Sequence, residues 1–479
     1  MNSLKTLIHK FFRYFMIAID GKEDDFTTGS IRRAIFLLSV PMVLEMGMEA
    51  IFAVVDIFFV SRVSTKAVAT VGLTESVLMI VYSIAIGLSM AATAIVARRV
   101  GEKNYTKAAD AAFQAILLGI SLAVIIGLPG YLFADQVLAA MGGDPQLIAE
   151  GVGYTQIMFA GNISILLLFL NNAILRGAGN ASVAMRALIL SNSLNLILDP
   201  ILIFGLGPIP AMGVTGAAIA TTLGRSIGVL YQLVILLRGT SVLRLTAANV
   251  VLRIKDIAEM FKIATGGIVQ FVVESLSWMF LIRIMSYFGE AAVAGYTLAF
   301  RVIVFTILPA WGMSNAAATL VGQNLGADQP DRAETSVWKS ARYNMIFLGV
   351  ISVIFFLFAR EVMNVFDEST VVLEFGARAL QIICLGYVFF AYGMVISQSF
   401  NGAGDTRTPV IINFFCFWIV QIPMAFLLSF HVDYVAGEWQ IEPWLGTDGV
   451  LISIAVCHSI HALVSIYIFK KGNWKLVKV

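Results

Sequence analysis

The stretch GLSMAATAIV at residues 87–96 has a relative later in the chain, GMSNAAATLV at residues 312–321. The two stretches lie 225 residues apart, and the same spacing relates GAGN (177–180) to GAGD (402–405). Without a gap, this offset also pairs Glu49 with Glu274, Gly101 with Gly326, Gln156 with Gln381 and Gly161 with Gly386. Several matches at one offset across most of the chain predict two halves that share one fold.

The composition is that of a membrane protein. Hydrophobic residues make up 59% of the 479 residues and charged residues only 13%, whereas soluble domains average about 25% charged. A helix needs about 20 apolar residues to cross a bilayer core, and continuous rather than alternating runs favour helices over barrel strands. Twelve such runs lie at approximately residues 34–60, 70–97, 108–133, 147–172, 183–206, 213–238, 263–287, 294–321, 333–358, 372–397, 408–430 and 446–469.

Basic residues gather in alternate connections between these runs. The connections rich in Lys and Arg lie before residue 34 and at 98–107, 176–186, 238–262, 331–342 and 470–478. The connections on the other side, such as GLGPIPAMG (205–213), carry no Lys or Arg. By the positive-inside rule, we expect a multi-pass protein of the cell inner (plasma) membrane with both termini cytoplasmic.

Together, the repeat and the runs predict an all-α polytopic membrane protein with twelve transmembrane helices in two six-helix bundles. An even number of crossings in each half relates the bundles by a pseudo-twofold axis along the membrane normal. This architecture favours an alternating-access transporter; a channel is the structural alternative, but no filter-like sequence is visible. We expect a cytoplasmic amphipathic or disordered tail at 1–30, bundles at 31–240 and 263–470, a cytoplasmic linker at 241–262, and a cytoplasmic tail at 471–479.

Acidic residues inside the apolar runs are the main candidates for function, because a charge at mid-bilayer costs about 2.5 to 3.5 kcal/mol on insertion scales. The first run carries Glu45, Glu49 and Asp56. With 3.6 residues per helical turn, the three acids fall on one narrow face. We expect that face to point into the protein and not toward lipid.

The fifth run carries Asn192, Asn195 and Asp199, which also share one helix face. Neither Asp56 nor Asp199 has an obvious Arg or Lys partner in the neighbouring runs. Two acids with side-chain amides suit Na⁺, which takes oxygen ligands, or a proton on a buried acid. A hydrogen-bonded polar cluster that holds two helices together is the alternative. Further candidate oxygen ligands are Asn172 and Thr221.

The second half lacks these groups. The 225-residue offset places Leu281 opposite Asp56, Val420 opposite Asn195 and Met424 opposite Asp199, so the cation site is expected in the first half only. Glu49 and Glu274 occur in both halves. They could bind a cationic substrate or carry a proton, or each could join a hydrogen bond between packed helices. The candidates for contact with substrate or a proton are Glu45, Glu49, Glu274, Gln270 and Tyr392.

The motifs VDIFFVSR, NNAILRGAGN, NLILDPILIFG and GVTGAAIATT, carried by two six-helix repeats, resemble the multidrug and toxic compound extrusion (MATE) family of the MOP flippase superfamily. The resemblance spans approximately residues 30–470. It implies export of organic cations or amphipathic drugs in exchange for Na⁺ or H⁺. Coupling would use Asp56, Asn195 and Asp199, which would be the metal ligands if the ion is Na⁺.

The resemblance leaves the branch of the family open. Glu274 resembles a glutamate on the seventh helix that the NorM branch uses, but the acid that branch has on its tenth helix is missing, since only Glu374 stands at the edge of that run. The acids of the first half resemble those of the DinF-like branch. The natural substrate is equally open.

A lipid-linked oligosaccharide or lipid flippase of the same superfamily is the alternative function. A flippase would need a strongly basic cavity for phosphate, and only Arg225, Arg283 and Arg301 are identified as basic residues near membrane depth. No nucleotide-binding loop or soluble domain indicates an enzyme. We expect no cofactor other than the coupling ion, small-molecule substrates and the lipid bilayer as partners, no nucleic acid, and function as a monomer.

Overall fold

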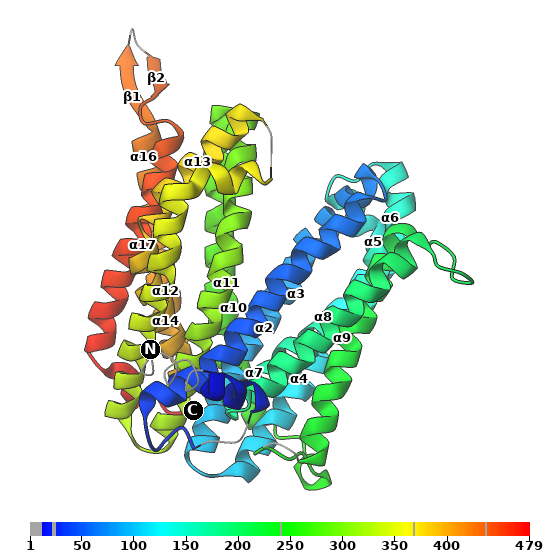
Figure 1. The fold of residues 1–479 in the computed structure, drawn as a ribbon, viewed down its shortest axis with the longest axis vertical. Coiled ribbons are helices and arrows are strands. Elements are labelled where there is room, and N and C mark those ends of the chain that lie inside the picture. Colours follow the sequence, from blue (N-terminus) through cyan, green and yellow to red (C-terminus); the bar gives the residue numbers. More distant parts are fainter. Residues whose placement is uncertain (1–11, 22–24, 240–241, 367–368, 436–437) are drawn as a thin grey trace, which may run out of the picture. The chain divides into compact units, whose positions relative to one another are not determined.

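The computed structural model describes residues 12–21, 25–239, 242–366, 369–435 and 438–479, and nearly all of these lie in helices (Figure 1). The described chain divides into two compact units. Unit 1 comprises the chain up to Ile268 together with Gly322–Gln329 and Val479, and unit 2 comprises Val269–Val321 and Pro330–Lys478. Residues 12–20 of the expected amino-terminal tail are helical, whereas residues 1–11 and 22–24 of that tail lie outside the described residues.

Unit 1 is a bundle of long helices followed by the start of α10 (Ile254–Met285), which begins inside the expected linker. Its other elements are α2 (Ile31–Ser61), α3 (Thr65–Gly101), α4 (Tyr105–Leu132), α5 (Ala134–Ala140), α6 (Pro145–Ala160), α7 (Asn162–Gly177), α8 (Ala181–Phe204), α9 (Gly213–Arg238) and η1 (Ala247–Asn249).

Unit 2 continues α10 and contains most of α11 (Glu290–Gly326). Its other helices are η2 (Ser286–Phe288), α12 (Pro330–Asn364), α13 (Thr370–Cys384), α14 (Tyr387–Ala403), α15 (Arg407–Asn413), the π-helical η3 (Phe414–Gln421), α16 (Ile422–Ser429), α17 (Thr447–Lys470) and η4 (Asn473–Leu476). An antiparallel hairpin of β1 (Phe430–Val435) and β2 (Glu438–Pro443) joins α16 to α17. The hairpin departs from the predicted all-α fold, as does an isolated β-bridge between Leu206 and Ile209, and both lie in connections instead of crossings.

The prediction of an all-α polytopic membrane protein is confirmed. Ten helical spans among the described residues are long and apolar enough to cross a membrane, and the pair α13 and α14, bent by 61°, makes an eleventh. The first of the twelve expected crossings corresponds to α2, a helix of 31 residues that carries the three acids. It is not one of these eleven apolar spans.

Polar residues at the helix starts explain where several spans begin. The Ser64 hydroxyl accepts the backbone N–H of Ala67 at the start of α3, and the Asn104 side chain accepts that of Lys107 at the start of α4. At α6 the Asp144 carboxylate accepts two backbone N–H groups, and Pro145 occupies the first helical position. Each cap satisfies donors that the first turn of a helix leaves unpaired.

The backbone repeats the sequence offset. Gly179, in the turn between α7 and α8, has φ 89°, and Gly404, 225 residues later, has φ 88°. Outside glycine, Lys103 and Asp328 are the described residues with positive φ, both at 58°, and the same offset separates them. Because left-handed backbone is unfavourable for residues with a Cβ, its recurrence at matched positions indicates that the halves share turn geometry as well as helix order.

Small residues let the helices of unit 1 pack closely. Helix α8 packs along α9, and α3 along α7 (Figure 1). At the α8–α9 contact, a Cβ on Gly216 would lie 2.4 Å from the carbonyl oxygen of Leu202. Small residues that allow backbones to approach are typical of helix interfaces in membranes.

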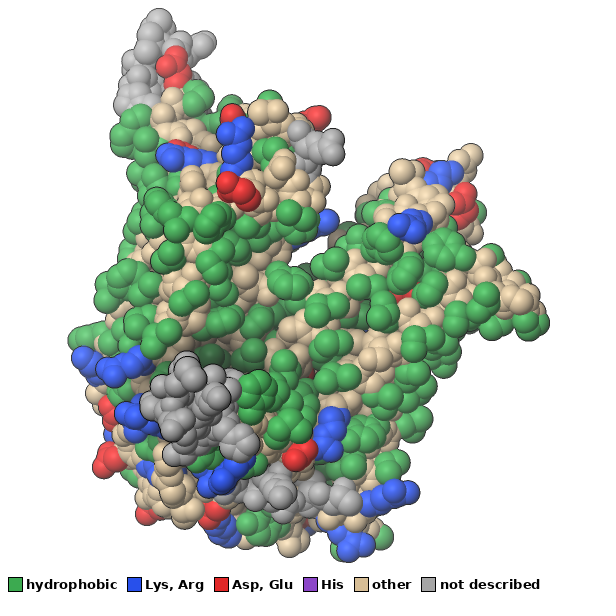
Figure 2. Space-filling model, in the orientation of Figure 1, with side chains coloured by type: hydrophobic (Ala, Val, Ile, Leu, Met, Phe, Trp, Pro, Cys, Tyr) green, Lys and Arg blue, Asp and Glu red, His purple; other side chains and the backbone are tan. Residues whose placement is uncertain are grey.

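Hydrophobic side chains also cover the outer flanks of the helices. Figure 2 shows apolar side chains along these flanks, with Lys and Arg gathered toward helix ends. On α4, Ile125 and Leu128 are more than half exposed, and on α12 so are Val353 and Leu357. Exposed apolar surface of this extent is what a lipid environment requires.

Gly216→Ala tests the close contact of α8 with α9. We expect a loss of about 1 to 3 kcal/mol of stability, because two backbones would have to separate, and a lower melting temperature of the purified full-length protein in detergent. Gly72→Ala is the matched control on α3, where a Cβ would meet nothing within 4 Å. Equal melting temperatures for the two variants would contradict the proposed contact.

Candidate functional site

Three helices of unit 1 bring together the predicted coupling residues. Asp56 lies on α2, Asn195 and Asp199 lie one turn apart on α8, and Thr221 lies on α9. The Asn195 Nδ2 group donates to Asp199 Oδ1 at 3.2 Å and to the Thr221 hydroxyl oxygen at 3.1 Å. Asp199 is completely buried and Asn195 is 2% exposed. The side-chain amide of Asn195 thus links α8 to α9 next to Asp199.

Two buried oxygens of this cluster have no hydrogen-bond partner, Oδ2 of Asp199 and Oδ1 of Asn195. Asp56, 9% exposed, makes no hydrogen bond or ion pair with any described residue, yet it lies close enough to Asp199 for the two charges to interact. Buried polar oxygens without partners cost free energy. Carboxylate, amide and hydroxyl oxygens are the ligands that hard cations take, so the residues present fit Na⁺. A proton on either acid would also reduce the repulsion between the Asp56 and Asp199 carboxylates.

Asn172 and Asn192 form their hydrogen bonds elsewhere. Asn192 Nδ2 donates to the carbonyl oxygen of Met48 on α2 at 3.2 Å, which ties α8 to α2. The Oδ1 atom of Asn172 on α7 accepts from the Gln232 side chain on α9. Both are contacts between helices, the first partly and the second fully buried, and the structure gives neither residue a bond to Asp56, Asn195 or Asp199.

The acids Glu45 and Glu49 have basic partners that sequence reasoning did not assign. Glu49 Oε1 lies 3.8 Å from Nη2 of Arg225 on α9, and Arg225 Nη1 donates to the Tyr82 hydroxyl at 3.1 Å. Glu45 Oε1 lies 2.7 Å from Nη1 of Arg176 on α7. Arg176 was missed as a basic residue at membrane depth, because it stands next to the GAGN turn and reads as the start of a connection.

The Glu45–Arg176 pair is a buried salt bridge that joins α2 to α7. Glu45 is fully buried and the Arg176 side chain is 9% exposed. The repeat offset places Gln270 opposite Glu45 and Asn401 opposite Arg176, so the second half carries neutral side chains at both positions. Because both partners of the pair are replaced together, the ion pair is a feature of the first half alone.

In unit 2 the candidate residues are not joined to one another by hydrogen bonds. Glu274 on α10 is partly buried and forms no hydrogen bond or ion pair with any described residue. The repeat offset places Val450 at the position of Arg225, which explains why Glu274 lacks the partner that Glu49 has. Gln270 is 6% exposed and its Oε1 atom is unpaired, and Tyr392 is half-buried. No bond between these three is observed.

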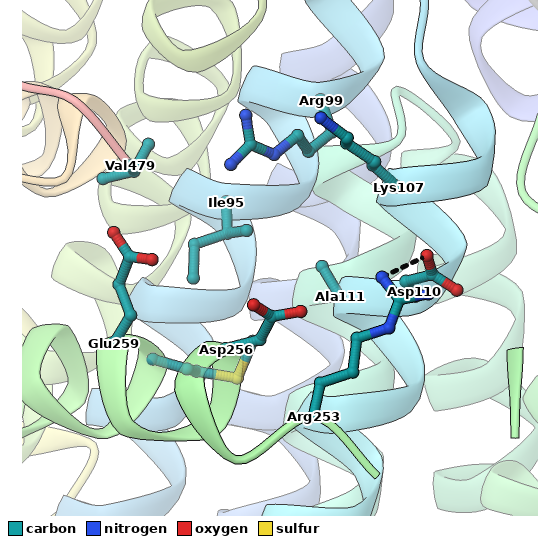
Figure 3. Close-up of a pocket in the computed structure, with 10 residues that line it drawn as sticks. Ile95, Arg99, Lys107, Asp110, Ala111, Arg253, Asp256, Glu259 and Val479 are labelled. Atoms are coloured by element: carbon teal, nitrogen blue, oxygen red, sulfur yellow. Dashed lines mark ion pairs between the residues drawn. The ribbon is translucent and has the colours of Figure 1, made fainter. Parts of the chain in front are cut away.

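A pocket of about 200 Å³ in unit 1 lies apart from the acid cluster (Figure 3). Arg253 Nη1 lies 2.7 Å from Asp110 Oδ2, and Asn249 Nδ2 donates to Asp110 Oδ1 at 2.8 Å. Figure 3 shows Arg99, Lys107, Asp256 and Glu259 around the same space. Because its walls carry both signs of charge, the pocket does not favour a ligand of either sign.

Two repeated sets of membrane-length helices, with acids buried among the helices of unit 1, define the chain as a multi-pass transport protein. The model of the MatE family matches residues 41–201 and again residues 267–427, so the chain belongs to the MatE family. The resemblance drawn from the motifs is thereby confirmed. The two matches also confirm the internal repeat, because they begin nearly one repeat offset apart. Members of this family are transporters and not enzymes.

Several curated proteins are similar along almost their whole length. The chain is 27% identical to the probable multidrug resistance protein NorM of Thermotoga maritima, covering 93% of each chain. It is 24% identical to the FAD transporter of Shewanella oneidensis, covering 85% of this chain and 90% of the relative. It is 22% identical to the multidrug export protein MepA of Staphylococcus aureus strain NCTC 8325, covering 92% and 94%. None of these names favours the flippase alternative.

Solved structures share the fold. A crystal structure of MATE in the straight conformation aligns with a TM-score of 0.86 at 25% identity, covering 94% of this chain and 98% of the other. An outward-facing MATE family multidrug resistance transporter of the MOP superfamily aligns with a TM-score of 0.84 at 26% identity, covering 94% and 98%. These alignments with whole transporter structures confirm the predicted fold class.

The buried Glu45–Arg176 pair generates a stability prediction. Glu45→Gln or Arg176→Asn alone should destabilise the protein by about 3 to 5 kcal/mol, because each leaves an uncompensated buried charge or an unpaired partner. The double variant reproduces the side chains that the second half uses, and should recover most of the loss. Melting temperatures of the three variants in detergent test this, and a double variant as unstable as the sum of the singles would refute it.

Proposed function

We propose that the protein is a secondary antiporter that exports organic cations or amphipathic drugs in exchange for Na⁺ or H⁺ by alternating access. The observation that carries the proposal is the buried cluster of Asp56, Asn195, Asp199 and Thr221, in which two oxygens have no partner. Relatives named as multidrug resistance or export proteins support drug export. The charge pattern of the connections supports a plasma-membrane protein with cytoplasmic termini, and we propose that it functions as a monomer.

The cluster can hold a cation in either of two ways. For Na⁺, oxygens are available from the carboxylates of Asp56 and Asp199, the amide of Asn195 and the hydroxyl of Thr221. Pro200, inside α8 and directly after Asp199, lacks a backbone N–H, so the preceding turn of α8 also keeps a free carbonyl oxygen. For H⁺, a proton on Asp56 or Asp199 removes the repulsion between the two carboxylates.

Coupling follows if the ion and the drug prefer different conformations. Ion binding at the cluster neutralises charge on α2, which carries Asp56, and α8, which carries Asp199. A ligand shifts a conformational equilibrium only by its difference in affinity for the two states. In our proposal, the ion stabilises the state that releases the drug, and return to the other state carries the ion inward.

A cationic substrate suits the remaining acids better than an anionic one. Among the described residues, Glu49 in unit 1 has only the long contact with Arg225, and Glu274 in unit 2 has no basic partner. A phosphate-bearing lipid or a flavin nucleotide would place further negative charge beside these acids, and like charges repel strongly where the local dielectric constant is low. Efflux of organic cations is therefore the first activity to test.

The direct test is transport into or out of proteoliposomes that contain a fluorescent organic cation. We expect transport by the wild type to follow an imposed Na⁺ or pH gradient, and Asp56→Asn and Asp199→Asn to reduce gradient-driven transport at least tenfold, because each removes a charge that holds the ion. Asp135→Asn, at an exposed acid near the start of α5, is the control. Full gradient-driven transport in both cluster variants would place the coupling site elsewhere.

Thr221→Val tests the contribution of the Thr221 hydroxyl separately from that of the two acids. Valine keeps the shape of the side chain but cannot accept the hydrogen bond of Asn195 or contribute an oxygen to an ion. We expect a roughly two- to tenfold higher ion concentration for half-maximal transport, as the loss of one hydrogen bond implies, with the maximal rate retained. Thr222→Val, at the next residue along α9, is the matched control, and an identical change in both variants would argue against the assigned role of Thr221.

A further inference from the structure

Arg225 is placed between two acids of α2. Glu49, Phe52 and Asp56 follow one another at helical spacing and share a face of α2. The guanidinium of Arg225 lies over the ring of Phe52, 5.4 Å from its centroid, and its Nη2 is 3.8 Å from Glu49. It also interacts electrostatically with Asp56. The cation is therefore near the middle of a row that has a carboxylate at each end.

The contact of Arg225 with Glu49 is loose. At 3.8 Å the nitrogen and oxygen are beyond the 2.7 to 3.2 Å of a hydrogen bond, unlike the 2.7 Å contact of Arg176 with Glu45. The Tyr82 hydroxyl on α3 receives the hydrogen bond of Arg225. Arg225 is only 6% exposed, so water offers little compensation for an ion pair this weakly formed.

Among the described residues, the surroundings of Arg225 are rich in acidic groups. Electrostatic interactions link Arg225, directly or through Asp56, to groups on α2, α3, α6 and α8. These titratable or charged groups are Glu49, Asp56, Glu75, Tyr82, Tyr154 and Asp199. Arg225 thus interacts, directly or through Asp56, with several carboxyl groups, and it cannot form a close pair with both Glu49 and Asp56 at once.

We propose that Arg225 is a built-in cation that exchanges between Glu49 and Asp56 and competes with the coupling ion for Asp56. This inference rests on the proposed function. With the ion bound by Asp56 and Asp199, Arg225 stays with Glu49. When the ion leaves, Arg225 turns to Asp56 and prevents two bare carboxylates from facing each other in the apolar bundle. Arg225 is a positioning residue, which acts on transport through Asp56.

The repeat supports a role beyond packing. The matched position in the second half is Val450, which is fully buried, and that half lacks counterparts of Asp56 and Asp199 as well. The basic residue and the acids of the cluster therefore occur together in the first half and are absent together in the second. An apolar residue at this position of the repeat is compatible with a packed helix, so an Arg225→Met variant has a precedent in the same fold.

A double-variant cycle tests the exchange. The full-length wild type, Glu49→Gln, Arg225→Met and the double variant are purified in detergent, and melting temperature is recorded against NaCl with choline chloride keeping ionic strength constant. A second series in choline chloride varies the proton concentration. Glu49→Gln should raise the half-saturating ion concentration roughly tenfold by releasing Arg225 to Asp56, and Arg225→Met should lower it by a similar factor.

The decisive result is the effect of Glu49→Gln in the absence of Arg225. If Arg225 exchanges between the acids, Glu49→Gln changes the half-saturating concentration less than about threefold in the Arg225→Met background. Equal effects in both backgrounds would mean that the two residues act only as fixed charges, and effects of the same sign for both single variants would mean a purely structural ion pair. Either result overturns the inference.

Asp199→Asn separates this inference from the proposed function. We expect this variant to lose its response to Na⁺ and to protons. A retained response would overturn the proposed ion site itself, whereas a lost response with additive effects of Glu49→Gln and Arg225→Met would overturn only the exchange of Arg225. Should Arg225→Met fail to fold, Arg225→Gln, which keeps a donor for the Tyr82 hydroxyl, completes the same cycle.

Discussion

The structure of unit 1 depends on how buried carboxylates are compensated inside an apolar helical bundle. An isolated charge without a partner is too costly at that depth. Glu45 is compensated by a short contact of Oε1 with Arg176, although its buried Oε2 has no hydrogen-bond partner, and Glu49 is compensated less closely, by a long contact with Arg225. Asp199 receives one hydrogen bond and keeps one bare oxygen. This gradation orders the acids by how readily a mobile cation could still be bound.

The repeat explains which of these features belong to the fold and which to function. Features needed for folding recur at the 225-residue offset, including the positive φ of Lys103 and Asp328 and the glycine turns at Gly179 and Gly404. Three charged groups of the first half do not recur. At the repeat offset, Arg176, Arg225 and Asp199 correspond to Asn401, Val450 and Met424. One backbone plan therefore carries these charged groups in the first half and uncharged residues at the matched positions of the second. Glu274 is the exception, and it has no basic partner among the described residues.

Helix order, the repeat and the acid-bearing faces could be predicted from the sequence, because hydrophobic length and helical periodicity are local properties. The partners of the acids could not, because they depend on packing between helices distant in the chain. Arg176 lies 131 residues from Glu45, and Asn172 bonds to Gln232 instead of joining the cluster it was expected to join. The hairpin between α16 and α17 was also missed, since its residues alternate too briefly to indicate strands.

Helix α9 connects the ion cluster to the charge pair. Thr221 and Arg225 are one turn apart on it, so a single face of α9 presents a hydroxyl to Asn195 and a guanidinium to Glu49. Helix α2 presents Asp56 and Glu49 with two turns between them. A small shift of α2 along α9 would therefore bring Arg225 closer to Asp56 as it moves Arg225 away from Glu49. Linkage of this kind needs no long pathway, because the same two helices carry both groups.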